Sequence, residues 1–247
     1  MVARVAKQAV MPGVQHDWRR YLAVLQKVLL SAAVLTGLVM GVMKLNDPNL
    51  LPIEKIRAQG TFINLTEAML LTRAGDIQGG YFNIDVSDVK ARIESLPWVD
   101  RAYVKRQWPD TLIIMVTEQQ ALARWGEAGL INLRGQAFYP DKGSIPAGLP
   151  QINGPEGFQS QLLEQYQQMN ALLAPTGFRI RQLDMDARRS ITLQLDEGLN
   201  IILGRDAYQS RLERFIRMYE KLLVTEIRYI RQIDMRYTNG FTILRKQ

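Results

Sequence analysis

The sequence predicts an α+β protein with a single membrane-spanning helix near its N-terminus and two domains of mixed helix and strand after it. Three observations carry this prediction. An uncharged apolar stretch covers residues 28–43, patterns in the order β-α-α-β-β follow it, and amphipathic helices then alternate with strands toward the end of the chain. With 247 residues, of which 47% are hydrophobic, the chain can pack one large core or two to three small ones.

The first element, at residues 22–43, is expected to be an uncleaved transmembrane signal anchor. The segment from Val28 to Met43 carries no charge, and with the residues before it reaches the ~20 residues needed to cross the hydrocarbon core of a membrane. Three alternatives compete. A buried core helix would carry a polar stripe and an interfacial helix a charged face, whereas a cleaved signal peptide would need small residues where the chain has Gly41-Val42-Met43.

The charges around the anchor predict its orientation. Basic residues outnumber acidic ones before it, and the two signs are interleaved after it. The positive-inside bias therefore keeps residues 1–21 in the cytoplasm, as a tail that we expect to be disordered, and exports the rest of the chain after a short linker at 44–51.

The first exported domain is expected at 52–121, beginning with a strand and two helices. Residues 53–60 predict a strand that ends at a glycine. Thr66 is a candidate N-cap for a short helix that stops at Gly75. Residues 85–96 then place apolar side chains at helical spacing, and a proline ends this second helix.

Two strands complete this domain, at 99–107 and 111–118. Trp108-Pro109-Asp110 between them predicts a turn, in which the proline fixes the bend, the aspartate holds turn amides and the tryptophan closes the apolar edge. The second strand is apolar on both sides, so its pattern leaves open which face packs.

A second domain, with a sheet rich in antiparallel strands, is expected at 122–247. Short strands and turns come first, and an ungapped internal similarity at an offset of fifty follows. Ile180 to Met185 reads IRQLDM and Ile230 to Met235 reads IRQIDM, and an amphipathic helix precedes each. The similarity predicts a repeated unit of a helix followed by a strand hairpin, with chance as the alternative.

The segment between the two copies predicts one more hairpin and a helix cap. Residues 191–204 alternate as two strands around a turn at Asp196-Glu197-Gly198. Asp206 is placed to cap the second amphipathic helix. After the second copy, Tyr237 to Gly240 is a strong turn signal, and the strand from Phe241 to Arg245 is either the edge of the sheet or internal to it.

The composition excludes most catalytic and metal chemistry. The chain has no cysteine and its one histidine is His16, so disulfides, cysteine zinc sites, thiolate nucleophiles and Ser-His-Asp triads cannot be built. Acidic clusters lack the spacing of a calcium loop, and no phosphate loop or serine-nucleophile motif is present. We expect no enzyme, metal, cofactor or small-molecule substrate, although inspection leaves a paired-carboxylate glycosidase open.

The net charge of +7 is spread along the chain. No run of five or six basic residues occurs, which favours a generally cationic surface over a stripe that binds nucleic acid. We therefore expect no nucleic-acid partner.

Three sub-motifs in order give the first exported domain a specific resemblance. They are L-P-W-V at Leu96 to Val99, W-P-D at Trp108 to Asp110, and A-R-W at Ala123 to Trp125, after a single N-terminal span. The chain resembles the FtsQ/DivIB family of bacterial cell-division proteins, in which a POTRA domain is followed by a β domain. Ala121 departs from relatives that often have proline there.

The resemblance implies a non-enzymatic scaffold of the division machinery. Such a protein lies in the cell inner membrane at the division septum, with its distal domains in the periplasm, and links early to late division proteins to control septal peptidoglycan synthesis. It implies FtsB and FtsL as partners, with FtsB adding a strand at the last strands of the chain, and other division proteins recruited through the POTRA domain.

The residues implied at these surfaces fall into two groups. The expected FtsB-binding residues, which include an R-Y-x-x-G element and a basic pair suited to an acidic partner, are Arg188, Arg189, Arg236, Tyr237, Asn239, Gly240, Phe241 and Ile243. Relatives often have an aromatic residue where this chain has Arg245. The expected recruitment surface comprises Arg101, Val104 and Arg106.

Two other functions remain open at this point. One is a POTRA chaperone or docking module for the assembly or secretion of outer-membrane β-barrels, which would bind barrel precursors. The other is an anchor for peptidoglycan hydrolysis, which would release wall fragments.

Overall fold

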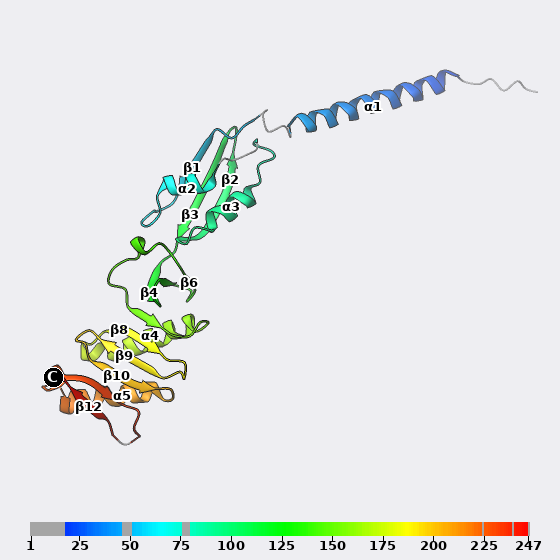
Figure 1. Ribbon diagram of the computed structural model, residues 1–247. Helices are drawn as coiled ribbons and strands as arrows, with labels where there is room; N and C mark the ends of the chain where they lie inside the picture. Colours follow the sequence, from blue (N-terminus) through cyan, green and yellow to red (C-terminus); the bar gives the residue numbers. More distant parts are fainter. Residues whose placement is uncertain (1–17, 46–50, 76–79, 224, 239, 247) are drawn as a thin grey trace, which may run out of the picture. The chain divides into compact units, whose positions relative to one another are not determined.

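A computed structural model describes residues 18–45, 51–75, 80–223, 225–238 and 240–246 (Figure 1). Most of the tail expected at 1–21, most of the linker expected at 44–51, and Asn239 lie outside the described residues. Within them the chain is α+β, as predicted: one long apolar helix, a β-α-α-β-β unit, and a mixed unit built on a larger sheet.

The apolar helix α1 extends from Trp18 to Leu45. Its segment Val24–Lys44 is 21 residues long with a mean hydropathy of 1.8, which is enough to cross a membrane by length and composition. None of that segment is buried. A core helix of a soluble protein would bury its apolar face against neighbouring elements, so the exposure of α1 favours a span over a buried helix.

The β-α-α-β-β unit forms a three-stranded sheet in the order β1-β3-β2. The elements are β1 (Lys55–Gln59), α2 (Glu67–Ala74), α3 (Val86–Glu94), β2 (Val99–Gln107) and β3 (Thr111–Glu118). The two helix signals act as predicted. The Thr66 side chain accepts a hydrogen bond from the Met69 N–H at 3.2 Å, and Gly75, with φ of 69°, ends α2.

The turn between β2 and β3 differs from the prediction in one respect. Trp108 is 71% exposed, so it does not close an apolar edge. Asp110 instead ties the turn to the start of β1. Its backbone carbonyl accepts from the N–H of Glu54 and Lys55, and its carboxylate lies 2.8 Å from Lys55 Nζ. With proline and aspartate already holding the bend, the indole is free to face solvent.

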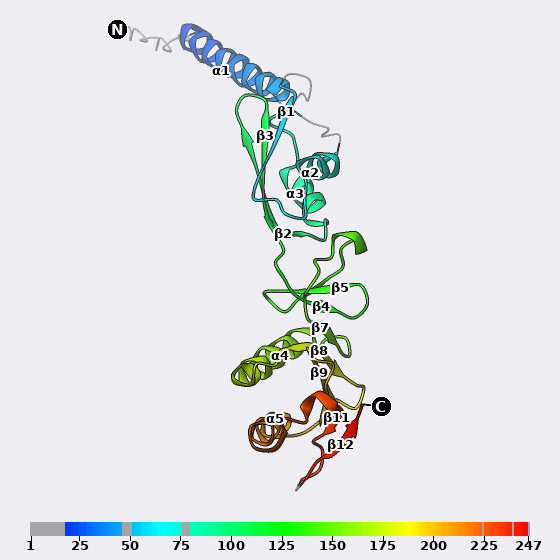
Figure 2. The ribbon, with the colours of Figure 1, turned by 90° about the vertical axis from the view of Figure 1, so that its left-hand side faces the viewer.

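The larger sheet has nine strands in the order β12-β11-β10-β9-β8-β7-β4-β5-β6 (Figure 1, Figure 2). Its strands are β4 (Ala121–Trp125), β5 (Gly129–Asn132), β6 (Ala137–Phe138), β7 (Gln151–Asn153), β8 (Ile180–Met185), β9 (Ile191–Leu195), β10 (Asn200–Gly204), β11 (Ile230–Asp234) and β12 (Thr242–Arg245). Five of the eight pairings are antiparallel, in agreement with the predicted antiparallel-rich sheet.

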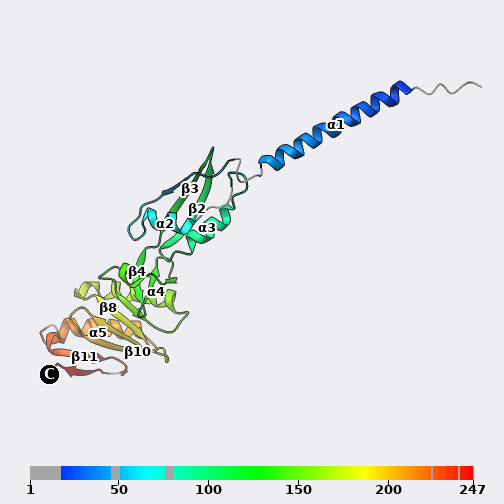
Figure 3. The same cartoon turned by 45° about the horizontal axis from the view of Figure 1, so that its top comes forward.

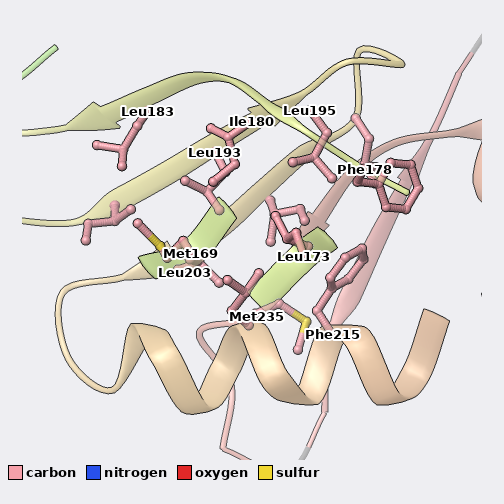
Figure 4. Close-up of a cluster of buried hydrophobic side chains, with 14 of the residues drawn as sticks. Met169, Leu173, Phe178, Ile180, Leu183, Leu193, Leu195, Leu203, Phe215 and Met235 are labelled. Atoms are coloured by element: carbon pink, nitrogen blue, oxygen red, sulfur yellow. The ribbon is translucent and has the colours of Figure 1, made fainter. Parts of the chain in front are cut away.

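Two helices, α4 (Gln159–Leu173) and α5 (Tyr208–Met218), cover one face of this sheet (Figure 2, Figure 3). A π-helical turn at Tyr219–Leu223 extends α5. Short 3₁₀ turns lie at Lys142–Ser144, Ala174–Thr176 and Ile227–Tyr229. The core lies between helices and sheet, where Met169 and Leu173 of α4 and Phe215 of α5 meet strand residues such as Leu193 (Figure 4).

The two sequence copies have the same strand register. Ile180 lies opposite Leu195 and Leu183 opposite Leu193 in the first hairpin. At an offset of fifty, Ile230 lies opposite Arg245 and Ile233 opposite Ile243 in the second. Each hairpin also has a register shift directly after its first pair. The likeness therefore extends from residue identity to the geometry of the backbone.

The expected cap of α5 is wrong. The N-cap position is Ala207, with φ of 53°, and no side chain caps the helix there. The helix begins one residue later than the pattern suggests, which leaves Asp206 outside the cap. Its carboxylate instead lies 3.3 Å from Arg205 Nε on the surface.

Candidate functional site

Strand β12 lies at one edge of the nine-stranded sheet and pairs with β11 alone among the described strands (Figure 2). All four of its residues are exposed. Ile243 and Leu244 are 37% and 52% exposed, which is unusual for branched apolar side chains in a sheet. A row of backbone N–H and C=O groups with no strand beside it can receive a strand from another chain.

Arg214 of α5 holds the segment that leads into β12. Its guanidinium donates hydrogen bonds to three backbone carbonyls, those of Met235 at 2.8 Å, Tyr237 at 2.7 Å and Thr238 at 2.5 Å. One planar fork thereby fixes the path of the chain as it leaves β11. Arg214 is not among the residues predicted from the sequence, although the arginines at every third position of α5 form a stripe that includes it.

Arg236, an expected partner-binding residue, already has a partner within the chain. Its Nη2 lies 2.7 Å from Asp234 Oδ2, and its Nε donates to the same carboxylate at 3.0 Å. The hydrogen bonds from Arg236 hold the pKa of Asp234 below its ordinary value of 3.8. The pair fixes the guanidinium at the end of β11, beside the edge strand.

We expect this pair to stabilise the folded protein at neutral pH and to stop doing so in acid. Because the folded pKa of Asp234 is lowered, its contribution to the free energy of unfolding is full above about 3.8 and is lost as the pH falls through the folded pKa. Thermal unfolding of the wild type and of Asp234→Asn should therefore differ at pH 6, and the difference should shrink as the pH falls below 3.8 and through the folded pKa of Asp234. Asp206→Asn is the control, and a gap for Asp234→Asn that persists unchanged in acid would contradict this account.

The other expected FtsB-binding residues of the second hairpin have different exposures. Tyr237 is 54% exposed, and Gly240 is partly exposed. Phe241 packs against the hydrophobic core and so anchors the start of β12. Asn239 lies outside the described residues. Arg245, at the position where relatives often have an aromatic residue, donates to Glu226 Oε2 at 2.9 Å.

Arg188 and Arg189 lie in the turn after β8, at the same end of the sheet as Arg236. Strands β8, β10 and β11 run in the same direction, because β9 is antiparallel to both β8 and β10, and β10 is parallel to β11. Their C-terminal turns therefore share one end of the sheet. A hollow of about 500 Å³ there is lined in part by Arg188, Arg189 and Arg205, and the Arg189 guanidinium lies 5.3 Å from the centre of the Phe158 ring.

The expected recruitment residues all lie on β2, an edge strand of the three-stranded sheet. Arg101 and Arg106 are exposed and Val104 is half-buried. They belong to a different sheet from the β12 edge, so the two expected surfaces are separate.

The fold and the site together define a class: a protein with one N-terminal apolar helix and two α+β units, which offers an open sheet edge for docking. Among the described residues no group of three or more His, Cys, Asp or Glu could hold a metal ion. An open strand edge such as that of β12 can receive a strand from another chain.

The family follows from two domain matches and from relatives. Residues 51–119 match the POTRA domain of FtsQ type, and residues 123–236 match the C-terminal domain of cell division protein FtsQ/DivIB. The chain is 33% identical over 217 residues to cell division protein FtsQ of Coxiella burnetii, covering 87% of this chain and 89% of that protein. It belongs to the FtsQ/DivIB family of cell division proteins, whose role is that of a division scaffold.

Two further relatives support the same family. FtsQ of Xanthomonas campestris pv. campestris is 36% identical over 199 residues, covering 79% of this chain and 70% of that protein. FtsQ of Shewanella oneidensis is 32% identical over 200 residues, covering 81% and 76%.

Proposed function

We propose that this protein is a non-enzymatic, single-pass scaffold of the division machinery that binds FtsB, and through it FtsL, by adding a strand of FtsB to β12. The observation that carries the proposal is the open, fully exposed edge of β12. Strand addition would satisfy the unpaired backbone groups of this edge and cover the exposed Ile243 and Leu244 side chains.

Charge at the end of the sheet supports the same partner. Arg188, Arg189 and Arg236 lie at the end from which β12 is entered, and positive charge there would steer an acidic segment of FtsB and fix its register. Because Asp234 already neutralises much of the charge of Arg236, the two arginines of the β8–β9 turn would carry more of this attraction.

The rest of the proposal concerns where the scaffold works. An excess of basic residues before the uncharged segment that begins at Val28 supports a cytoplasmic N-terminus, with both α+β units in the periplasm. The POTRA unit would be recruited by other division proteins through β2, at Arg101, Val104 and Arg106. Concentrated at the septum, the protein would link early to late division proteins and thereby control septal peptidoglycan synthesis.

Site-specific photo-crosslinking in dividing cells tests the docking edge. A photoreactive residue at Leu244, which is 52% exposed on β12, is expected to crosslink to FtsB. The same residue at Leu133, which is 60% exposed and follows β5 in another part of the sheet, is the matched control and should give no such product. Crosslinks from Leu244 to barrel precursors in place of FtsB would overturn the proposal.

A further inference from the structure

A second exposed surface belongs to the POTRA unit, around the turn between β2 and β3. The Trp108 side chain in this turn is 71% exposed, whereas Trp98 and Trp125 are buried. Phe82, in the segment between α2 and α3, is 47% exposed. Exposed apolar surface of this kind marks a site that binds a protein or a membrane. Neither Trp108 nor Phe82 takes part in the proposed docking edge at β12.

Both exposed aromatic residues lie beside the segment 51–55, which leads into β1. The N–H of Tyr81 donates to the Leu51 carbonyl at 2.8 Å, and the N–H of Glu54 donates to the Asp110 carbonyl at 3.0 Å. The two attachment points on this segment are at most about 11 Å apart, because only three peptide units separate them. The aromatic residues next to these contacts therefore share one end of the three-stranded sheet.

The aromatic rings are held in place by their neighbours. The ring of Phe82 meets the ring of Tyr81 edge-on, with 5.3 Å between the ring centroids and 82° between the ring planes. In the turn, the carboxylate of Asp110 lies 2.8 Å from Lys55 Nζ, so the acid beside Trp108 is already paired with a cation. We call Tyr81, Phe82 and Trp108 the aromatic set.

The short connection to α1 keeps the aromatic set close to the membrane. Only residues 46–50 separate Leu45, the last residue of α1, from Leu51. Because an extended chain advances at most about 3.6 Å per residue, Leu51 lies no more than about 22 Å from Leu45. The segment that can span a membrane ends at Lys44. A tether this short raises the effective concentration of lipid around the aromatic set, so weak contacts with the membrane are sufficient.

The chemistry of the aromatic set suits the boundary between a membrane and water. Tryptophan and tyrosine are enriched at that boundary, because each combines an apolar ring with a polar N–H or O–H group. Glu54 and Asp85 are exposed near the set. Anionic headgroups are therefore not expected to attract it, and a zwitterionic lipid surface fits better.

We propose that the aromatic set rests in the headgroup region of the membrane that α1 spans, on the side of the two α+β units. Trp108 and Phe82 place their rings at the interface, and Tyr81 supports the ring of Phe82. The POTRA unit is thereby held against the bilayer by lipid contact as well as by the chain that leads to α1. This inference depends on α1 as a membrane span but not on the docking edge at β12.

Fluorescence quenching in nanodiscs of phosphatidylcholine tests the proposal on the full chain. Because the chain has no cysteine, Gln107→Cys places a single environment-sensitive fluorophore beside Trp108. Gln107 is exposed, and so is Glu197, in the turn between β9 and β10, which serves as the matched label site. We expect a lipid with a nitroxide on its headgroup to quench the label at residue 107 at least threefold more strongly than the label at residue 197.

A pair of double variants separates the aromatic rings from mere proximity to the bilayer. Trp108→Ser/Phe82→Ser should lower the quenching at residue 107 at least twofold. Tyr139→Ser/Tyr229→Ser removes two aromatic side chains of similar exposure from the β domain and should leave that quenching unchanged. Because all four side chains are exposed, their loss is not expected to prevent folding, and thermal unfolding of each variant checks this.

Two results would overturn the proposal: equal quenching at the two label sites, or quenching at residue 107 that is unchanged in Trp108→Ser/Phe82→Ser. Shielding of the label by added division proteins, without quenching by lipid alone, would also overturn it and make the aromatic set a protein-binding surface. FtsB should co-purify with this double variant as with the wild type. Failure of the membrane contact is therefore distinguishable from failure of the proposed docking edge.

Discussion

Tyr237→Glu is expected to abolish co-purification of FtsB with the full-length protein. Tyr237 is 54% exposed in the segment that leads into β12, where an added strand would bury it. A carboxylate there would have to be desolvated on binding, and the neighbouring Arg236 is already engaged by Asp234. The measurement is the amount of FtsB recovered with the tagged protein from detergent-solubilised membranes.

The matched control for this substitution is Tyr139→Glu. Tyr139 is 55% exposed and follows β6, which is the opposite edge strand of the nine-stranded sheet. It therefore adds the same charge to the same domain without touching the β12 edge. Both variants should remain in the membrane fraction. Full recovery of FtsB with Tyr237→Glu would remove β12 as the docking edge.

Arg214→Ala is expected to weaken FtsB binding at least tenfold although Arg214 need not touch the partner. The substitution removes three hydrogen bonds from a charged donor to backbone carbonyls, each of which contributes about 1.5–3 kcal/mol. The segment at 235–238 would then have to be ordered when the partner binds. A tenfold loss of affinity corresponds to about 1.4 kcal/mol. A fraction of the free energy of the three lost hydrogen bonds is therefore enough to weaken binding tenfold.

Arg217→Ala is the control, because Arg217 is exposed one turn later on the same helix. Arg214→Lys keeps the charge but not the planar fork, and should fall between the wild type and Arg214→Ala. Hydrogen exchange at residues 235–238 provides an independent readout, since the amides of this segment should exchange faster in Arg214→Ala. Unchanged affinity together with faster exchange would show that order in this segment does not limit binding.

Local patterns in the sequence were sufficient to predict most helices and strands. The limits of α2 at Thr66 and Gly75 could be predicted because helix capping depends on residues only a few positions apart. The hairpin turn at Asp196-Glu197-Gly198 was predicted for the same reason, and β9 and β10 are antiparallel around it.

The two wrong predictions depended on a long-range contact in one case and on an unusual backbone conformation in the other. Trp108 was expected to cover an apolar edge, but Lys55, far away in sequence, fixes the turn through Asp110. Asp206 fails as a cap because a single left-handed residue at Ala207 moves the start of the helix. Neither the contact of Lys55 with Asp110 nor the left-handed conformation of Ala207 can be predicted from the local pattern of polar and apolar residues.

The candidate site was predictable only in its outline. A turn signal followed by a final strand pointed to β12, whereas its place at the sheet edge depends on the parallel pairing of β11 with β10, the strand that lies between the two copies. The role of Arg214 depends on α5 packing over that pairing.

The shared register of the two hairpins carries a consequence for the direction of a docked strand. In the first copy, the outer side of β9 is already occupied: β10 runs antiparallel to it, with Ile201 opposite Leu193. The residue fifty positions after Leu193 is Ile243, in the strand whose outer side is open. The pairing of β10 with β9 is therefore a template for a strand docked on β12. A docked strand that follows this template would run antiparallel to β12, with one of its residues opposite Ile243.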